Sequence, residues 1–156
     1  MLVAVPKNIL ANDYHIERDG QRVAFLDTAL FKRQGTIEIG GKLLRVERKG
    51  LVRPDFKLYL NDAEIARAHK PAILRDAVRL QLGETECIIR RKHLFSRRFE
   101  VWNGEERIGE IAHIRWYSNR ARIDLPDAWP LGLQVFVFWV VLTFWQRDRS
   151  SSGSNT

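Results

Sequence analysis

A run of seventeen residues without a charge, Trp129 to Trp145, lies near the end of a chain that is otherwise polar and basic. Its sequence is WPLGLQVFVFWVVLTFW, which beyond Pro130 is apolar on every face of a helix. Such a helix is buried either in protein or in lipid. Its β-branched and aromatic residues have low intrinsic helix propensity, so the surroundings must enforce the helix. A buried strand is the alternative, which the length of the run disfavours.

The rest of the chain contains a threefold repeat. The segments YHIERDGQRVA (Tyr14 to Ala24), FKLYLNDAEIA (Phe56 to Ala66) and FEVWNGEERIG (Phe99 to Gly109) begin with aromatics that lie 42 and then 43 residues apart. Each segment has an apolar residue two positions later, turns through Asp-Gly, Asn-Asp or Asn-Gly, and ends in Ala or Gly. Alternation around such a dipeptide is typical of a β-hairpin.

A second set of hairpins lies between the first. TIEIGGKLLRV (Thr36 to Val46) alternates around a Gly-Gly pair, and RLQLGETECII (Arg79 to Ile89) does so around one glycine, 43 residues later. A further step of 43 residues reaches RARIDLP, where Pro126 ends the pattern. The unit is therefore a pair of hairpins, repeated three times with its last strand missing. The repeats supply eleven strands, and the N-terminal LVAVP supplies a twelfth that closes the sheet.

Dimensions favour burial of the apolar run inside this sheet. Eight strands make a barrel that its own side chains fill, whereas about twelve leave an interior too wide for side chains alone. A helix about 10 Å across would fill that space, and seventeen residues would rise about 25 Å. A membrane anchor is the alternative, but a spanning helix needs about 20 apolar residues. We therefore expect a mainly β fold: a closed antiparallel barrel of about 12 strands wrapped around a buried hydrophobic C-terminal α-helix.

The domain should occupy residues 1–147, followed by a disordered polar tail at 148–156 that is rich in serine.

Three features of the sequence resemble one known group of proteins. They are the hairpin YHIERDGQRVA, the segment IIRRKHLFSRRFEVWNGEERIGEI (Ile88 to Ile111) and the prolines before the apolar run. Together they resemble the tubby C-terminal-like superfamily, which includes tubby-like, LURP-one-related and phospholipid scramblase proteins; the Ile88 segment is most similar to LURP-one-related sequences. The resemblance covers roughly Met1 to Arg147. It implies a cylindrical barrel that binds phosphoinositides or acidic phospholipids, but the basic site of tubby proteins has no residue-by-residue match here.

The charge balance favours an anionic partner. The chain carries 26 Lys and Arg against 19 Asp and Glu, a formal net charge of +7. Such an excess attracts phosphates, nucleic acid or an anionic membrane surface. Nucleic acid is disfavoured because no RRM, KH, zinc-finger or helix-turn-helix pattern is present and no aromatics for base stacking stand out. We expect an anionic phospholipid or phosphoinositide as ligand, with a protein partner as the alternative.

Two connections between repeats concentrate the basic residues. RRKHLFSRR (Arg90 to Arg98) has five Arg or Lys among nine residues, and RVERKGLVRPDFK (Arg45 to Lys57) is its counterpart one repeat earlier. Arg binds phosphate through paired hydrogen bonds and Lys as a point charge. Stacked repeats would bring both connections to one end of the barrel as a positive rim, whose apolar tip could enter a lipid interface. The alternative for Arg90 to Arg98 is a solvated loop between repeats with Phe95 in the core. The candidate ligand-binding residues are Arg90, Arg91, Lys92, Arg97, Arg98, Arg48, Lys49 and Arg53.

Patterns typical of catalysis are absent from the sequence. The four histidines are scattered without metal-site spacing, and Cys87 aligns with Leu44 in the repeat, as expected for a small buried hydrophobe. No P-loop, G-x-S-x-G or G-x-G-x-x-G motif occurs. We expect a non-enzymatic binding module without cofactor or metal, cytoplasmic because one cysteine suits a reducing compartment, and peripheral at the membrane. The alternatives are a protein-interaction scaffold, a C-terminally membrane-anchored protein and an enzyme with an unrecognised site.

Overall fold

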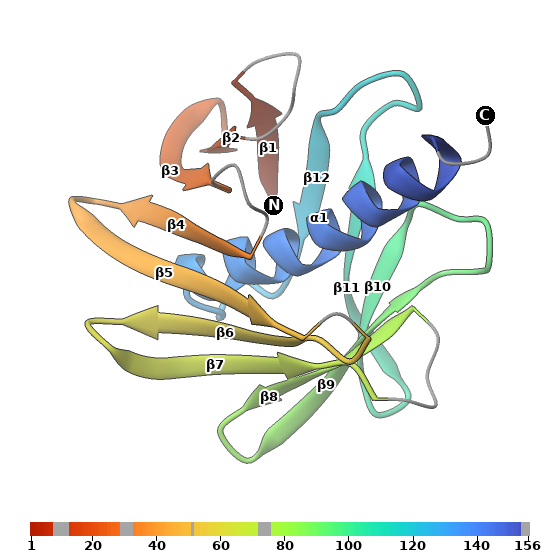
Figure 1. The fold of residues 1–156 in the computed structure, drawn as a ribbon. Helices are drawn as coiled ribbons and strands as arrows, with labels where there is room; N and C mark the ends of the chain where they lie inside the picture. Colours follow the sequence, from red (N-terminus) through yellow and green to blue (C-terminus); the bar gives the residue numbers. More distant parts are fainter. Residues whose placement is uncertain (8–12, 29–32, 51, 72–75, 154–156) are drawn as a thin grey trace.

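The computed structural model describes residues 1–7, 13–28, 33–50, 52–71 and 76–153. Within these residues, twelve strands form a closed antiparallel barrel around one C-terminal helix (Figure 1). Consecutive strands pair with each other, and β1 pairs with β12 to close the ring. The strands are β1 (Leu2–Pro6), β2 (Asp13–Arg18), β3 (Gln21–Asp27), β4 (Gln34–Ile39), β5 (Lys42–Lys49), β6 (Asp55–Leu60), β7 (Ala63–His69), β8 (Ala77–Leu82), β9 (Thr85–Arg91), β10 (Phe99–Asn103), β11 (Glu106–His113) and β12 (Ala121–Asp124).

The barrel has two different ends. Two-residue turns join β2 to β3, β4 to β5, β6 to β7, β8 to β9 and β10 to β11, all at what we call the turn end. In the first of them Asp19 and Gly20 have φ of 53° and 79°, as a type I′ hairpin turn requires. The odd-numbered strands finish at the opposite end, which we call the link end. The helix enters the barrel at the turn end and leaves it at the link end.

The threefold repeat predicted from the sequence appears in the pairing of the strands. A register shift follows Ile16, Leu58 and Val101, at the same point of each unit. A small residue faces each of the three. In the last unit a close approach explains it, because a Cβ on Gly109 would lie 2.6 Å from the carbonyl oxygen of Asp124. The small residues are Ala24, Ala66 and Gly109.

The helix α1 (Leu131–Gly153) runs through the inside of the barrel. From Val135 to Trp145 every residue is at most 7% exposed, so the helix is buried on all its faces. The predicted closed barrel with a C-terminal helix is confirmed. The alternatives of a buried strand and of a lipid-embedded anchor are wrong for this segment, because the barrel wall covers it. No helix among the described residues combines the length and hydropathy that a membrane crossing requires.

The repeated aromatic residue of each unit packs against the helix. These three residues stand on β2, β6 and β10, which are one third of the barrel apart. Each contacts a different aromatic ring of α1, so the helix is held from three sides by equivalent positions of the repeat. The pairs are Tyr14 with Phe138 at 5.2 Å between ring centroids, Phe56 with Trp139 at 5.7 Å, and Phe99 with Phe144 at 5.4 Å.

The helix extends past the domain limit predicted at residue 147. The expected disordered tail is wrong for residues 148–153, which are helical, while residues 154–156 lie outside the described part of the chain. The physical reason is that the buried helix already provides the nucleus for further turns. Ion pairs then fix the extension to the barrel: Arg147 donates to Asp76 on the link before β8, and Asp148 accepts from Arg91 at 3.0 Å.

Candidate functional site

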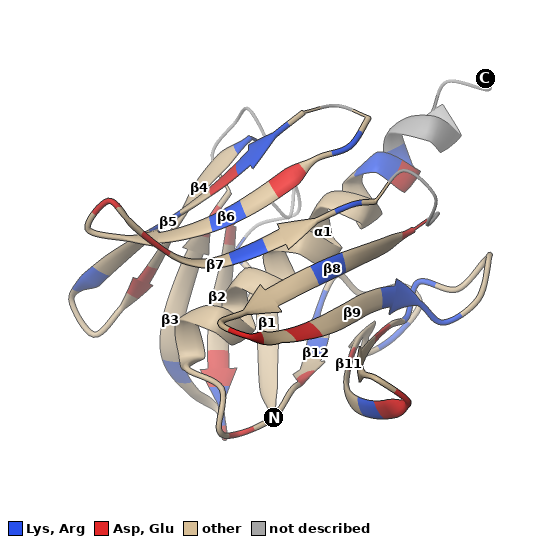
Figure 2. Cartoon of the chain, turned by 90° about the horizontal axis from the view of Figure 1, so that it is seen from below, with Lys and Arg blue, Asp and Glu red and all other residues tan. Residues whose placement is uncertain are grey.

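Charge is segregated between the two ends of the barrel. Among the described residues that connect strands, the charged side chains at the turn end are all acidic, whereas those at the link end are mostly basic (Figure 2 colours the charges on the ribbon). The strands beside the turns also carry cations at that end, namely Arg18, Arg22, Lys42 and Arg107. The resulting field attracts anions to the link end. The acidic residues of the turn end are Asp19, Asp62, Glu84, Glu105 and Asp127. At the link end, the charged residues of the connections and of the end of α1 comprise the acidic Asp76 and Asp148 and the basic Lys7, Arg33, Arg53, Lys70, Lys92, Arg97, Arg98, Arg115, Arg120, Arg147 and Arg149. Asp13, Asp27 and Asp55 lie at the strand ends there.

The two basic connections predicted from the sequence both reach the link end, because β5 and β9 finish there. They are nevertheless four strands apart around the ring. Their side chains line separate cavities: Arg48 and Lys49 border one of about 620 Å³, and Arg97 borders another of about 240 Å³. The predicted positive rim is thus present as a shared end, with the two groups of residues in different cavities.

Arg91 has a structural position. Its side chain is 8% exposed and lies between two carboxylates, with Nε 3.3 Å from Asp76 and Nη2 3.0 Å from Asp148. Its Nη1 also donates to the carbonyl oxygen of Ser96 at 2.7 Å. Burial by itself would raise the pKa of Asp76, but the hydrogen bond from Arg147 and the charge of Arg91 hold that pKa below its usual value. Arg91 therefore fastens α1 to the barrel.

The other predicted residues divide into partnered and exposed side chains. Three lie against partners on the wall: Arg90 stacks over the Trp102 ring at 4.4 Å, Arg98 is 3.4 Å from Glu110 and Lys49 is 3.2 Å from Glu47. Arg48 is half-buried, and burial together with the positive charge of Arg33 lowers the pKa of its guanidinium. Arg53, Lys92 and Arg97 are exposed, and so are Arg90, Arg98 and Lys49 beside their partners.

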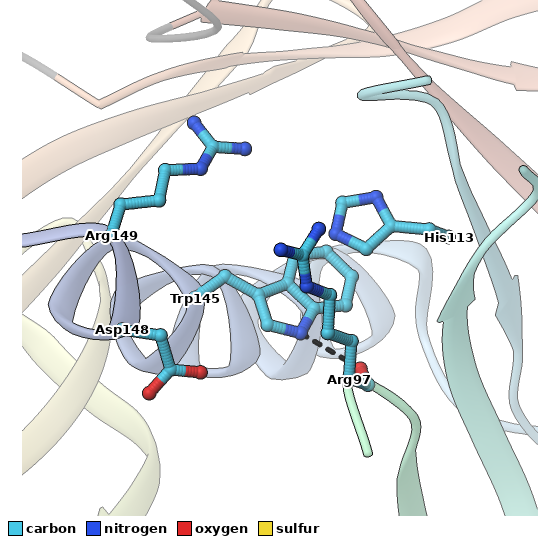
Figure 3. Close-up of a pocket in the computed structure, with 5 residues that line it drawn as sticks. All are labelled: Arg97, His113, Trp145, Asp148 and Arg149. Carbon is cyan, nitrogen blue, oxygen red and sulfur yellow. Dashed lines mark hydrogen bonds between the residues drawn. The ribbon is translucent and has the colours of Figure 1, made fainter. Parts of the chain in front are cut away.

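The cavity of about 240 Å³ lies at the link end, where α1 leaves the barrel (Figure 3). Its lining comes from three elements: Arg97 from the connection after β9, His113 from the end of β11, and Trp145, Asp148 and Arg149 from α1. Trp145 organises the site, since its Nε1 donates to the carbonyl oxygen of Arg97 at 2.8 Å. The Trp145 ring also stacks on the His113 imidazole, with 4.0 Å between centroids.

The electrostatics of this cavity suit an anion. Burial, followed by the positive charges of Arg97 and Arg149, lowers the pKa of His113 to about 4, so the imidazole is neutral at pH 7. Its Nδ1 is buried without a hydrogen-bond partner. The carboxylate of Asp148 is bound by Arg91, which reduces its repulsion of an incoming anion. Two guanidinium groups beside a neutral imidazole form an arrangement that matches phosphate.

Sequence reasoning missed the connection 114–120 and the histidine that precedes it. The segment IRWYSNR lies 22 residues after KHLFSRR and has Ser and Arg at the same positions. That spacing is half of the repeat, so a comparison of hairpins rather than of hairpin pairs would have found it. His113, Trp145 and Arg149 gave no comparable pattern, because only the return of α1 through the barrel brings them together.

Other chemistry is sparse in the described part of the chain. Cys87 is buried, as predicted, and burial raises the pKa of its thiol, which disfavours a reactive thiolate. His, Cys, Asp and Glu side chains form no group of three or more there that could hold a metal ion. At the turn end a mainly apolar cavity of about 380 Å³ lies beside Leu131, the first residue of α1, between the walls of β5 and β7.

The fold and this site define the chain as a closed twelve-stranded barrel with an internal helix and a basic opening at one end. No protein-family model, no curated protein and no solved structure matches this chain. The likeness to the tubby C-terminal-like superfamily remains an inference from the residues of the sequence.

Proposed function

We propose that this protein is a non-enzymatic binding module that captures an anionic, phosphate-bearing ligand at the link end of its barrel. Phospholipid head groups, including phosphoinositides, are the ligands that the charge and the resemblance favour together, with reversible association to the membrane that carries them. The observation that carries the proposal is the segregation of charge: basic side chains dominate one end and acidic turns occupy the other.

The cavity between Arg97 and Arg149 is the place where a phosphate group would be held. Each guanidinium offers a planar pair of donors that fits two phosphate oxygens. Trp145 fixes the backbone at Arg97, and a 3.0 Å hydrogen bond to Asn119 fixes the Arg149 guanidinium, so one guanidinium and the backbone that carries the other are positioned before the ligand arrives. Preorganised donors lose little conformational entropy on binding, which favours affinity.

Titration with a soluble inositol trisphosphate at low salt tests this proposal, with binding followed by calorimetry. The charge-reversal variant Arg97→Glu/Arg149→Glu should bind at least about tenfold more weakly, because two charge-assisted contacts become repulsive. Affinity of the native protein should also fall as salt rises.

The matched control is Arg18→Glu/Arg22→Glu, which changes the net charge equally with exposed arginines at the turn end. Both variants are compared with the native protein at 0.1 M salt, where charges beyond a Debye length of about 10 Å are largely screened, so the control should stay within about twofold of the native affinity. A native protein that ignores the probe at low salt, or equal losses in the two variants, would overturn the proposal.

A further inference from the structure

The connection between β9 and β10, residues 92–98, is a closed and rigid loop. The amide of Lys92 donates to the carbonyl oxygen of Arg98 at 2.8 Å, which closes its base. Inside it, the amide of Ser96 donates to the carbonyl oxygen of His93 at 2.9 Å. The Ser96 hydroxyl accepts from the amide of Arg98 at 3.0 Å. Three hydrogen bonds within the loop therefore close it, and Ser96 makes two of them.

The connection between β11 and β12, residues 114–120, repeats that loop 22 positions later. The amide of Ile114 donates to the carbonyl oxygen of Arg120 at 3.0 Å, and the amide of Ser118 donates to that of Arg115 at 3.1 Å. The Ser118 hydroxyl accepts from the amide of Arg120 at 3.1 Å. Each of the three bonds within the first loop has its equivalent, so the chain builds the same loop twice. We call residues 92–98 and 114–120 the twin loops.

The twin loops expose apolar side chains at equivalent positions. Leu94 and Phe95 are 62% and 90% exposed, and Trp116 and Tyr117, which occupy the same places, are 86% and 64% exposed. A single exposed apolar residue needs no explanation. Four exposed apolar residues at the tips of two neighbouring loops with the same conformation form a surface typical of an interaction site. The alternative from the sequence, with Phe95 in the core, is wrong.

The two tips are fixed relative to each other by the helix. The twin loops bridge β9 to β10 and β11 to β12, which are contiguous in the barrel. Trp145 donates to the carbonyl oxygen of Arg97 in the first loop, and Arg149 donates to Asn119 in the second. Arg97 and Asn119 are again equivalent positions. The phosphate-binding cavity proposed above is bordered by the first loop and by His113, which directly precedes the second.

Cations surround these tips and no acidic residue occurs in either loop. Aromatic side chains favour the interface between head groups and acyl chains, and each Lys or Arg near an anionic leaflet contributes about 1 kcal/mol. The basic charge together with the exposed Leu94 and three aromatic side chains therefore favours an anionic bilayer as the occupant of this surface. The basic residues of the twin loops are Lys92, Arg97, Arg98, Arg115 and Arg120.

We propose that the twin loops dock the protein on an anionic bilayer by inserting their four apolar tips into its interface. The proposal rests on the proposed function for the charge attraction and adds the bilayer itself as the partner. A head group free in solution would occupy the cavity without contacting the tips. Binding to vesicles and binding to a free head group should therefore respond differently to changes at the tips.

The test uses vesicles of phosphatidylcholine with about a third phosphatidylserine, within the range of anionic leaflets, and measures binding by co-sedimentation. Phe95→Ser/Trp116→Ser removes one exposed tip side chain from each loop and should weaken vesicle binding at least about tenfold. Its affinity for the soluble inositol trisphosphate should stay within about twofold of native. Leu43→Ser/Ile65→Ser, at exposed apolar positions near the turn end, is the matched control and should bind vesicles as the native protein does.

A second measurement reports the insertion directly. The other tryptophans are buried or half-buried, so Trp116 should dominate any change in fluorescence. Its emission should shift to shorter wavelength on vesicles and be quenched by brominated lipid, and Trp116→Phe should abolish both effects. Vesicle binding that survives Phe95→Ser/Trp116→Ser overturns the proposal. Native protein that ignores the vesicles at low salt also overturns it. Tip-dependent vesicle binding without trisphosphate binding supports the docking surface and overturns the proposed phosphate cavity.

Discussion

At the scale of single residues, His113 couples the stability of the barrel to its site. The ring is stacked on Trp145 inside the opening of the barrel, with Arg97, Arg149 and Asp148 as the charged groups that line the same cavity. Its pKa is about 4 in the folded protein, against an ordinary value of 6.5. An anion between the two arginines would offset their repulsion of a proton, so ligand binding should raise this pKa.

Stability should depend on pH through His113. Between pH 6.5 and pH 4 the unfolded chain binds a proton that the folded protein does not bind, so the free energy of unfolding falls as pH drops through that window. The loss should reach about 3 kcal/mol at most. Urea unfolding at pH 7, 5.5 and 4 measures it, and His113→Phe, which keeps a stacking ring, should flatten the dependence. Parallel curves for the two proteins would contradict this.

Asp76 provides an internal comparison for that experiment. The pKa of its carboxyl is depressed below 3.8, so the stability it contributes is present above that value and is lost only at lower pH. The two contributions therefore occupy separate pH ranges. The remaining histidines are common to the native protein and His113→Phe, and they cancel in the difference.

Residues were the least predictable level from the sequence. Arg91 was expected to bind a ligand, but its partners Asp76 and Asp148 are 15 and 57 positions away, and no local pattern joins them. The exposure of Phe95 and Trp116 depends on how each connection folds, which the hydrogen bonds of the twin loops decide. The place of His113 depends on the return of Trp145 on α1. The clusters of Lys and Arg in the sequence predicted the basic end of the barrel. They did not distinguish a basic residue with a structural ion pair, such as Arg91, from one exposed to a ligand.

At the scale of elements, the threefold repeat could be predicted from the sequence because the residues that form each hairpin lie within that hairpin. Turn dipeptides and alternation are local, so the strands follow from short segments. The end of α1 was not readable, because its polar last turns are stabilised by ion pairs with the barrel. The twin loops could be predicted only in part. The sequence shows their matching serines and arginines, but it does not show the hydrogen bonds that close each loop.

The repeated aromatic should be the most sensitive position of each unit. Phe56 is buried against Trp139, and Phe56→Ala should lower the free energy of unfolding by about 3–5 kcal/mol. Phe25, on β3 and only half-buried, is the matched control, and Phe25→Ala should cost clearly less. Urea denaturation of both variants compares them. If both variants lowered the free energy of unfolding equally, the contact of Phe56 with the helix would contribute no more than an ordinary half-buried side chain.

At the scale of the whole molecule, the barrel and its helix depend on each other. Among the described residues, the inner faces of the twelve strands pack on the apolar helix and the helix is buried by those faces. A chain that ends at Pro130 should therefore lack a cooperative unfolding transition and bind a hydrophobic dye, as expected for a collapsed state without fixed packing. Circular dichroism during heating measures this, with the full chain as the reference. A sharp transition in the shortened chain would refute the mutual dependence.

Because the helix follows all twelve strands in the sequence, it also determines the order in which the elements can fold during synthesis. Each hairpin can form as soon as it is synthesised, because its contacts are local. The ring cannot close around a filled centre until α1 has been made, and the pairing of β1 with β12 spans almost the whole chain. During that interval the nascent sheet exposes its apolar inner face and two unpaired edge strands, which makes it prone to aggregation. Nascent chains of this protein should therefore require chaperones. A stalled or prematurely terminated translation product should be a substrate for chaperones and proteases.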